Sequence, residues 1–398
     1  MSYSSSRRAF LKRVAASGSL MTAAATADVA PIQGFDETSS NTAKDRVWTP
    51  ISERKIKVGI VGYGVCQFGA AFGFQDHPNV EVVAVSDLFP DRCAELARVC
   101  RCGKTYPSLE ELVKDPDIEA VFVATDAPSH CRHCMDVLQH GKHVASAVPA
   151  VFGGSIEDAD RLFEAVKASG LNYMMFETSA FRDDCYAMRA IFKADGFGKL
   201  VYSEGEYFHY CPTPIDSYKG WRQGSPPLWY PTHSTAYYVC VSGGSFTKTS
   251  CCGMPSHLPY LQPDCNPYKN LFGTEVALLR TSEGGMARMM MSKDTPGHGG
   301  EVGRVRGQKG SMVGLAYDGT ADISSIELTK PPLPPSVGAG GHGGSHGYLC
   351  EEFVNSILEE RTPLINIAWA LNMTVAGIVS HQSALKDGEL LDIPQYTL

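Results

Sequence analysis

The stretch from Lys57 to Gln67, KVGIVGYGVCQ, constrains the fold of this chain more than any other segment. Its apolar start predicts a buried strand, and Gly62 and Gly64 can adopt positive φ and bring bare backbone close to a ligand. A strand, such a turn and then a helix favour a bound pyrophosphate, because the first N–H groups of a helix have no backbone partner. The third glycine of the GxGxxG pattern would stand at position 67, which is Gln here. We expect the turn to contact the ligand through Gly62, Tyr63, Gly64, Val65 and Cys66.

A second apolar run, Val80–Ser86, predicts the neighbouring strand. Asp87 follows it, 23 residues after Gly64. This is close to the spacing expected for a carboxylate that accepts hydrogen bonds from the adenosine ribose. The pattern therefore predicts NAD as cofactor, with NADP disfavoured by Asp87; the alternative is a βαβ unit that binds no nucleotide.

Strands and helices then alternate, which indicates a parallel sheet. The expected helices are 90–100, 108–114, 129–140 and 155–169, and the further strands are 120–124, 143–146 and 172–176. Ligands of open α/β sheets bind at the carboxyl ends of the strands. We therefore expect Thr125, Asp126 and His130, which follow the strand 120–124, to contact the cofactor.

The pattern changes after residue 177. Strand-like runs at 200–208, 275–279, 286–292 and 311–315 lack intervening helices of crossover length, so they indicate a second, largely antiparallel sheet. A helix is expected from Tyr348 to about Glu360. The fold class is thus α/β, with a doubly wound parallel Rossmann sheet and a C-terminal α/β domain with a large open sheet. The expected segments are a signal peptide (1–27), a linker (28–54), a Rossmann domain (55–177) and a C-terminal domain (178–398).

The N-terminus resembles a twin-arginine export signal. Arg7 and Arg8 stand in SRRAFLK, and a mildly apolar segment, Val14–Ala27, ends in the small residues ATA. That segment is too short and too polar for a stable membrane span. We therefore expect the twin-arginine translocase as a partner and the periplasm as the location; the alternative is a basic disordered tail.

Charge and cysteine content narrow the possible partners. The formal charge is −8 and becomes −12 without residues 1–27, so we expect no nucleic-acid or anionic-lipid partner. The chain has 13 cysteines, and Cys131 and Cys134 have the spacing of a metal or redox pair. No second such pair accompanies them, so we interpret them as helix residues and expect no metal site.

Several segments together resemble the glucose–fructose oxidoreductase, inositol dehydrogenase and MocA (Gfo/Idh/MocA) family. They are the glycine turn, residues 125–130, GKHV at 141–144 before Val148-Pro149, and residues 196–200 before a long strand. The resemblance covers nearly the whole chain after the signal. It implies a Rossmann domain that binds NAD or NADP, a C-terminal domain whose open sheet often forms an oligomer interface, and a sugar or cyclitol substrate. We therefore expect a carbohydrate substrate and a homo-oligomer.

The sequence departs from that family at the residue that would transfer the proton of the substrate hydroxyl. The family's Glu-Lys-Pro signature, whose lysine lies near the nicotinamide, corresponds here to Ala147, Val148 and Pro149. Valine exchanges no proton, so another group must carry it, although Val148 and Pro149 should still adjoin the cofactor. The candidates for catalysis are His233, Tyr230, Tyr207 and His209. Residues 207 and 209 would share one face of a strand.

The same residues are similar to one branch of the family, the NAD-dependent glycoside hydrolases that act on N-acetylgalactosaminides. That branch also has Val-Pro, but with Glu where this chain has Ala147. Glu177 and the run GGHGG at 340–344 share in this resemblance, which makes Glu177 a candidate for substrate contact. Trp221 could stack on a sugar ring, and His342 and His346 could form part of a lid over the sugar. Each also has a plain structural interpretation: a surface acid for Glu177, a core aromatic for Trp221 and residues of a flexible loop for the two histidines. His209, His233 and the two tyrosines could likewise be packing residues.

Three functions remain open on the sequence. In the first, a tightly held NAD takes a hydride from a sugar carbon while His233 or a tyrosine removes the hydroxyl proton. Tight binding is expected because no exchangeable NAD pool exists outside the cytoplasm. In the second, oxidation, elimination, hydration and reduction hydrolyse a glycoside without net redox change. In the third, the protein binds NAD or carbohydrate without catalysis.

Overall fold

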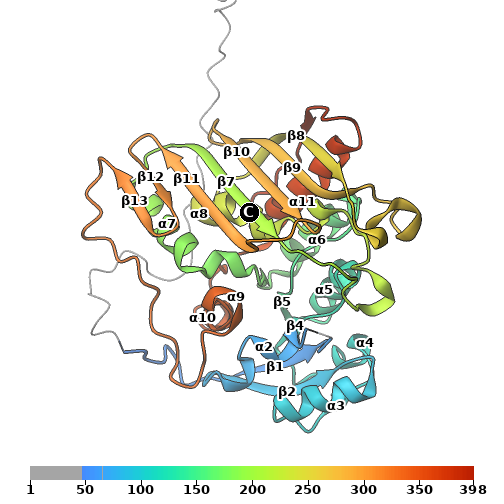
Figure 1. Ribbon diagram of the computed structural model, residues 1–398. Coiled ribbons are helices and arrows are strands. Elements are labelled where there is room, and N and C mark those ends of the chain that lie inside the picture. The colour runs from blue at the N-terminus through green and yellow to red at the C-terminus, as the bar shows by residue number, and fades with distance from the viewer. Residues whose placement is uncertain (1–46, 65) are drawn as a thin grey trace, which may run out of the picture.

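The computed structural model describes residues 47–64 and 66–398 (Figure 1). The expected signal peptide, most of the expected linker and Val65 lie outside the described residues. Two sheets dominate the described part, one below the other in Figure 1, and the α/β fold class predicted from the sequence is confirmed.

The first sheet comprises six strands within the described residues, and every neighbouring pair is parallel. In spatial order they are β3 (Thr105–Tyr106), β2 (Val80–Ser86), β1 (Ile56–Val61), β4 (Ala120–Val123), β5 (His143–Ser146) and β6 (Tyr173–Met175). The connecting helices are α2 (Phe68–Ala71), α3 (Pro90–Val99), α4 (Leu109–Leu112), α5 (His130–Gln139) and α6 (Ile156–Ser169). The chain order reverses between β1 and β4, and a crevice for ligands opens at such a switch point.

The turn after β1 differs from the sequence-based expectation. The helix that follows, α2, has only four residues, so it offers little of the dipole that we expected at this turn. Gln67 adopts a left-handed conformation with φ 56°. The packing role of the missing third glycine falls to Gly69, because a Cβ there would lie 2.4 Å from the Gly62 carbonyl oxygen.

The second sheet comprises eight strands within the described residues, and only β7 and β10 pair in parallel. In spatial order they are β13 (Ala316–Gly319), β12 (Gly310–Val313), β11 (Gly300–Gly307), β7 (Leu200–Phe208), β10 (Met286–Ser292), β9 (Phe272–Thr281), β8 (Phe246–Pro255) and β14 (Leu391–Asp392). The predicted runs correspond to β7, β9, β10 and β12. The sequence-based prediction missed β8, β11, β13 and β14.

Helices cover one face of the second sheet, as Figure 1 shows. They are α7 (Asp183–Lys193), α8 (Thr232–Ser242) and α11 (Ile367–Ala384), and α9 (Gly341–Gly344) and α10 (His346–Leu358) lie toward the first sheet. Helix α8 approaches β7 so closely that a Cβ on Gly205 would lie 1.9 Å from the Ser234 carbonyl oxygen. This approach places the start of α8 beside the end of β7.

The longest helix of the described residues, α11, contacts both layers. Its residues are buried almost throughout, and it contacts both α6 of the first domain and β8 of the second. Such an all-round apolar helix belongs to the protein core. No helix within the described residues combines the length and hydropathy that crossing a bilayer would require.

The contact at Gly69 generates a stability prediction. We expect Gly69→Ala to lower the free energy of unfolding by about 1–3 kcal/mol, because the added methyl group would overlap the Gly62 carbonyl and press on Ile60 and Leu96. Thermal and urea unfolding measure the change. Gly103→Ala is the matched control, since nothing lies within 4 Å of its Cβ position. Equal stability of the two variants would contradict the packing role of Gly69.

Candidate functional site

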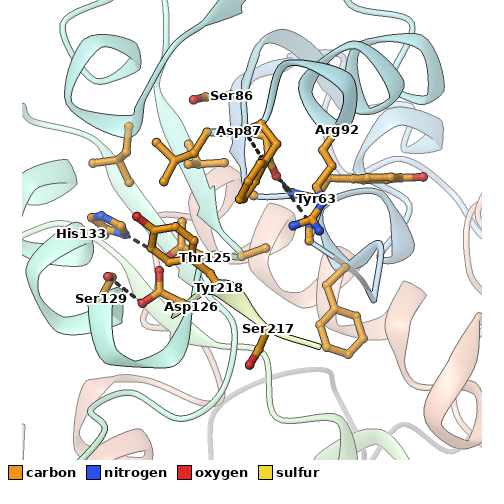
Figure 2. Close-up of a pocket in the computed structure, with 18 of the residues that line it drawn as sticks. Tyr63, Ser86, Asp87, Arg92, Thr125, Asp126, Ser129, His133, Ser217 and Tyr218 are labelled. Atoms are coloured by element: carbon orange, nitrogen blue, oxygen red, sulfur yellow. Dashed lines mark hydrogen bonds between the residues drawn. The ribbon is translucent and has the colours of Figure 1, made fainter. Parts of the chain in front are cut away.

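A first cavity opens at the carboxyl ends of β1, β2 and β4 (Figure 2). Its lining includes Gly62, Tyr63, Gly64, Cys66, Asp87, Thr125, Asp126, residues 216–219, Trp221 and Arg222. The sequence-predicted cofactor residues are thus brought together, apart from Val65, which lies outside the described residues, and His130, Val148 and Pro149, which lie elsewhere.

Asp87 is held at the mouth of this cavity by backbone donors. Its Oδ2 accepts hydrogen bonds from the N–H groups of Tyr63, at 2.8 Å, and Gly64, at 3.4 Å, and its Oδ1 accepts one from Phe89. The carboxylate therefore has a fixed position at the end of β2, where the ribose of a dinucleotide would be recognised.

The glycine turn exposes its backbone to the same cavity. Gly62 has φ 96°, and a Cβ there would lie 2.4 Å from the Ala124 carbonyl oxygen. Gly64 has φ 61°, and nothing lies within 4 Å of its Cβ position. The turn is closely packed at Gly62 and open at Gly64, and Asp87 stands at the end of β2. These three features fit a bound dinucleotide. Gly62, Tyr63, Gly64 and Asp87 would hold it there.

The residues after β4 form a polar wall. Thr125 Oγ1 lies 2.9 Å from His133 Nδ1, and Asp126 Oδ2 accepts a hydrogen bond from Ser129 Oγ at 2.9 Å. His130 is instead buried, with its ring nitrogens 2.8 Å from Pro149 O and 3.1 Å from Thr125 O. Burial lowers the pKa of His130, and a neutral imidazole has a single N–H, so its ring donates to one of these two carbonyls at a time.

A second cavity of about 370 Å³ adjoins the first and lies between the two domains. Cys66, Phe68, Ala124, Thr125, Trp221 and Arg222 line both cavities. The four candidate catalytic residues, Tyr207, His209, Tyr230 and His233, all line the second cavity. Val148 also lines it, so an apolar side chain occupies the place where the resemblance implies a lysine.

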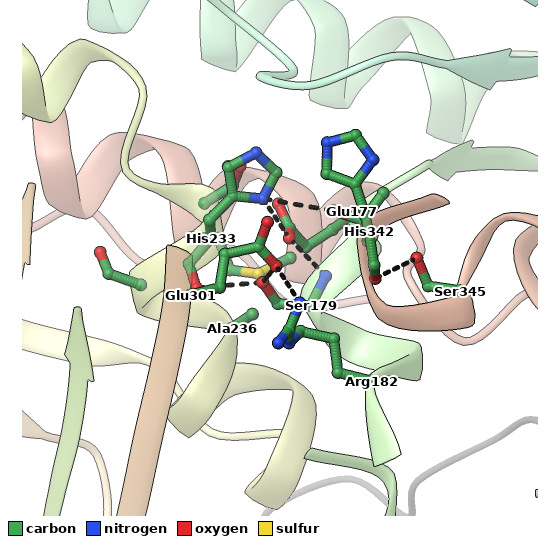
Figure 3. A network of polar contacts seen from close by, with 12 residues as sticks. Glu177, Ser179, Arg182, His233, Ala236, Glu301, His342 and Ser345 are labelled. Carbon is green, nitrogen blue, oxygen red and sulfur yellow. Dashed lines mark hydrogen bonds and ion pairs between the residues drawn. The ribbon is translucent and has the colours of Figure 1, made fainter. Parts of the chain in front are cut away.

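His233, near the start of α8, forms a buried ion pair with Glu177 (Figure 3). Its Nδ1 lies 2.7 Å from Glu177 Oε1, which also accepts a hydrogen bond from the N–H of Ser179 at 2.8 Å. Nδ1 is thereby committed to the carboxylate, and Nε2 is the remaining proton-transfer atom. The surface interpretation of Glu177 is wrong, because its exposed fraction is 0%.

The pair fixes the charge of the imidazole. Burial acts to lower the pKa of His233, but Glu177, with Glu301 behind it, outweighs burial and raises the pKa to about 9. His233 therefore holds a proton at pH 7. The neutral imidazole that suits a base near pH 7 is not the resting form of this site.

Aromatic rings surround His233. The Tyr207 and Tyr230 ring centroids lie 4.7 and 5.5 Å from that of His233, and Tyr207 stacks on His209 at 5.4 Å. Burial raises the pKa of both tyrosines and lowers that of His209 to about 4. At pH 7 both hydroxyls are therefore neutral donors, and His209 is a neutral imidazole.

The two histidines of the glycine-rich segment have different positions. His342 lines the second cavity, with its ring centroid 6.3 Å from that of His233. Its Nδ1 lies 2.8 Å from Nε2 of His346. His346 is buried behind it, with Nδ1 3.1 Å from Ala71 O, and neither it nor Pro149 belongs to the described lining of either cavity.

Some lining residues were not anticipated from the sequence. Arg222 lines both cavities, and Cys211, Tyr260 and Lys293 line the second. Only Lys293 carries a local signal, because it directly follows the predicted strand 286–292, and strand ends form such sites. The others come from loops whose course depends on tertiary packing.

Cys131 and Cys134 both lie on α5 as buried free thiols. Burial raises the pKa of each to about 12, which leaves them unreactive thiols. In residues 47–64 and 66–398, no three His, Cys, Asp or Glu side chains are grouped as a metal site would need.

Residues 56–177 match the family model GFO_IDH_MocA, described as "Oxidoreductase family, NAD-binding Rossmann fold". Glycosyl hydrolase family 109 protein 3 of Phocaeicola vulgatus is 32% identical over 164 residues, which are 39% of this chain and 29% of that protein. A glycosyl hydrolase family 109 protein of Solibacter usitatus is 23% identical over 86% of this chain and 88% of its own length. The chain thus spans less than two thirds of the first of these relatives.

Solved structures that share the fold include two dehydrogenases. Levoglucosan dehydrogenase, in complex with NADH and levoglucosan, has a TM-score of 0.73 at 17% identity, over 86% of this chain and 100% of that chain. Apo scyllo-inositol dehydrogenase from Lactobacillus casei has a TM-score of 0.65 at 17% identity, over 86% and 99%. At this identity the similarity establishes the arrangement of the two domains and not the substrate.

The ion pair generates a titration prediction. We expect His233 in the ligand-free protein to titrate near pH 9, and Glu177→Gln to move its midpoint to lower pH because the carboxylate no longer stabilises the imidazolium. Histidine-selective NMR measures both midpoints, and His233→Gln identifies the resonance by its disappearance. A wild-type midpoint near the unperturbed value of about 6.5 would contradict the pairing.

Proposed function

We propose that this chain is an NAD-dependent enzyme that oxidises or reduces a sugar or cyclitol, because residues 56–177 match the Gfo/Idh/MocA oxidoreductase family model. The observation that carries the proposal is that His233, paired with Glu177 behind it, lines a cavity that shares residues with the dinucleotide-binding cavity. A proton-transfer group and the cofactor residues therefore border one continuous space.

The chain's own residues would divide the work as follows. When bound, NAD supplies the acceptor and donor of a hydride. His233 takes or returns the hydroxyl proton at Nε2, because Nδ1 is held by Glu177. Glu177 stabilises the imidazolium, and Tyr207 and Tyr230 are neutral hydroxyls in the same wall that can orient the substrate. In this assignment His233 takes the role of the lysine that the resemblance implies at the position of Val148.

The raised pKa of His233 sets the pH dependence. Oxidation of an alcohol needs an unprotonated His233, so its rate should rise as pH approaches about 9. Reduction of a ketone needs the protonated form, so its rate should fall as pH rises through the same value. The two directions thus have opposite pH profiles.

A second function has its own support. The relatives named glycosyl hydrolase family 109 proteins, together with Val148, favour a redox-neutral glycosidase. Oxidation of a sugar carbon would acidify the neighbouring C–H bond, unprotonated His233 would remove that proton in place of the Tyr207 hydroxyl, whose pKa is raised, and the aglycone would leave. Water would then add and the hydride would return.

We also propose that the protein is exported by the twin-arginine translocase to the periplasm and forms a homo-oligomer. The export proposal is supported by Arg7, Arg8 and the small-residue end of the segment at 25–27. The open face of the second sheet supports self-association, because Val302 on β11 and Leu278 on β9 are exposed there.

For the activity, we expect the gently denatured protein to release NAD, detected by mass spectrometry. His233→Gln should keep that NAD but lower kcat/KM by about 10²–10⁴-fold, because the proton-transfer group is lost. The measurement is a screen of cyclitols, sugars and aryl glycosides. NADH formation supports the dehydrogenase, whereas glycoside cleavage without an absorbance change supports the hydrolase.

His298→Gln is the matched control, since this histidine is exposed. Full activity in His233→Gln would remove His233 from the mechanism. Absence of any bound or binding dinucleotide would reject both enzymatic functions.

For the location, we expect conversion of Arg7 and Arg8 together to Lys to keep the protein in the cytoplasm. The charge is unchanged, so the result isolates recognition of the arginine pair from simple electrostatics. Cell fractionation of a bacterial host that has the pathway measures it, with Arg13→Lys as the control. Periplasmic accumulation of the double variant would reject the proposed route.

A further inference from the structure

The wall of the second cavity is rich in hydrogen-bond donors and cations. Its described lining contains Arg222 and Lys293 and four histidines, His130, His209, His233 and His342, but no aspartate, glutamate, asparagine or glutamine. The chain as a whole carries a formal charge of −8. The cationic lining is therefore a local property of this cavity and does not follow from the composition.

Lys293 is fixed in that wall by its backbone and by its ammonium group. It directly follows β10, its N–H donates to Gly273 O at 2.9 Å and its carbonyl accepts from Cys211 N–H at 3.0 Å. Its Nζ donates to the carbonyl and hydroxyl oxygens of Ser225, at 2.6 and 2.7 Å. An ammonium group has three protons, so one donor remains for a ligand.

Arg222 lies in the same wall and is held by aromatic rings. Its guanidinium lies over Trp221, at 4.2 Å from the ring centroid, and over Tyr230, at 5.7 Å. This stacking fixes the plane of the guanidinium without using up its fork of N–H donors. Such a fork binds planar or tetrahedral anions through two parallel hydrogen bonds.

No carboxylate of the described residues forms an ion pair with either cation. Glu275, on the neighbouring strand, pairs with His381 and accepts from the Leu228 N–H. Asp294, beside Lys293 in the chain, accepts from Thr274. Both of these acids near Lys293 are thus engaged elsewhere, and within the described residues neither Lys293 nor Arg222 has an ion-pair partner.

Two cations that lie in one wall without an ion pair raise the free energy of the ligand-free site. Burial, reinforced by Arg222, lowers the pKa of Lys293 to about 7. An anion between the two side chains would offset this cost, and a neutral ligand would not.

We propose that the sugar substrate carries an anionic substituent, a carboxylate or a sulfate ester, and that Lys293 and Arg222 bind it. This inference rests on the proposed function, because it names the substrate class of the same cavity. Neutral sugars also require acceptors for their hydroxyl protons, and a wall without carboxylates or amides supplies few. An anion accepts hydrogen bonds only, which matches the donors that this wall offers.

Calorimetric titration of the NAD-loaded protein at pH 6, where Lys293 is protonated, tests the proposal. The probes are galacturonate and glucuronate for the carboxylate, galactose 6-sulfate for the sulfate ester, and galactose and glucose as neutral partners. We expect at least one anionic probe to bind ~10-fold or more tightly than its neutral partner. Whichever anion shows the preference identifies the substituent.

Variants of Lys293 then test whether this residue causes the preference for the anionic probe. Arg222 also lines the first cavity, whereas Lys293 lines the second alone, so Lys293→Met leaves the dinucleotide cavity intact. We expect Lys293→Met to weaken the preferred anion ~30-fold or more and the neutral sugar less than ~3-fold. Lys293→Arg keeps the charge and should retain the preference. Lys248→Met, which removes a lysine paired with Asp392 at the edge of the second sheet, is the control for net charge.

The outcomes separate this inference from the proposed function. Equal binding of anionic and neutral sugars, or an equal loss of both in Lys293→Met, overturns the anion site. If that protein still holds NAD and oxidises neutral sugars, the proposed function stands without the anion site. If the protein holds no NAD, the proposed function fails. The difference in affinity between the anionic probe and its neutral sugar still tests whether the anion site exists.

Discussion

The site depends on a buried ion pair that spans the two domains. Glu177 stands just after the last strand of the first sheet, and His233 stands at the start of the helix that packs on the second sheet. Both side chains are almost wholly removed from water, so each charge relies on the other. Removing one partner of such a pair typically costs about 3–5 kcal/mol. The pair therefore links the relative position of the domains to the protonation state of the imidazole.

The sign of the charge around this pair is opposite to the net charge of the chain. An acidic chain surrounds a cavity whose described lining has cations but no carboxylate, and Glu177 lies behind His233 instead of in the lining. A cleft of one sign with low-dielectric walls concentrates ligands of the opposite sign. Charge thus gives the cavity a selectivity that the shape of the fold does not explain.

Local patterns carried much of the fold prediction. The strands at 80–86, 143–146, 200–208 and 286–292 have the predicted limits, because apolar runs between turn residues are local signals. The expected helix dipole after the glycine turn was wrong, since α2 ends after one turn. The sequence-based prediction also did not identify the packing role of Gly69, because that role depends on contact with the Gly62 carbonyl and not on sequence spacing.

The sequence alone determined the residue types of the site: the glycine turn, Asp87, the Val148 substitution and the Tyr207, His209, Tyr230 and His233 group. The glycine turn and Asp87 followed from motif spacing, whereas Val148 and the tyrosine and histidine group were singled out through the resemblance to the Gfo/Idh/MocA family. Only the tertiary structure decided that Glu177 is buried against His233 and that Lys293 joins Arg222 in one wall. Burial and charge pairing arise from segments 56 or more residues apart, and they set a pKa that no local pattern encodes.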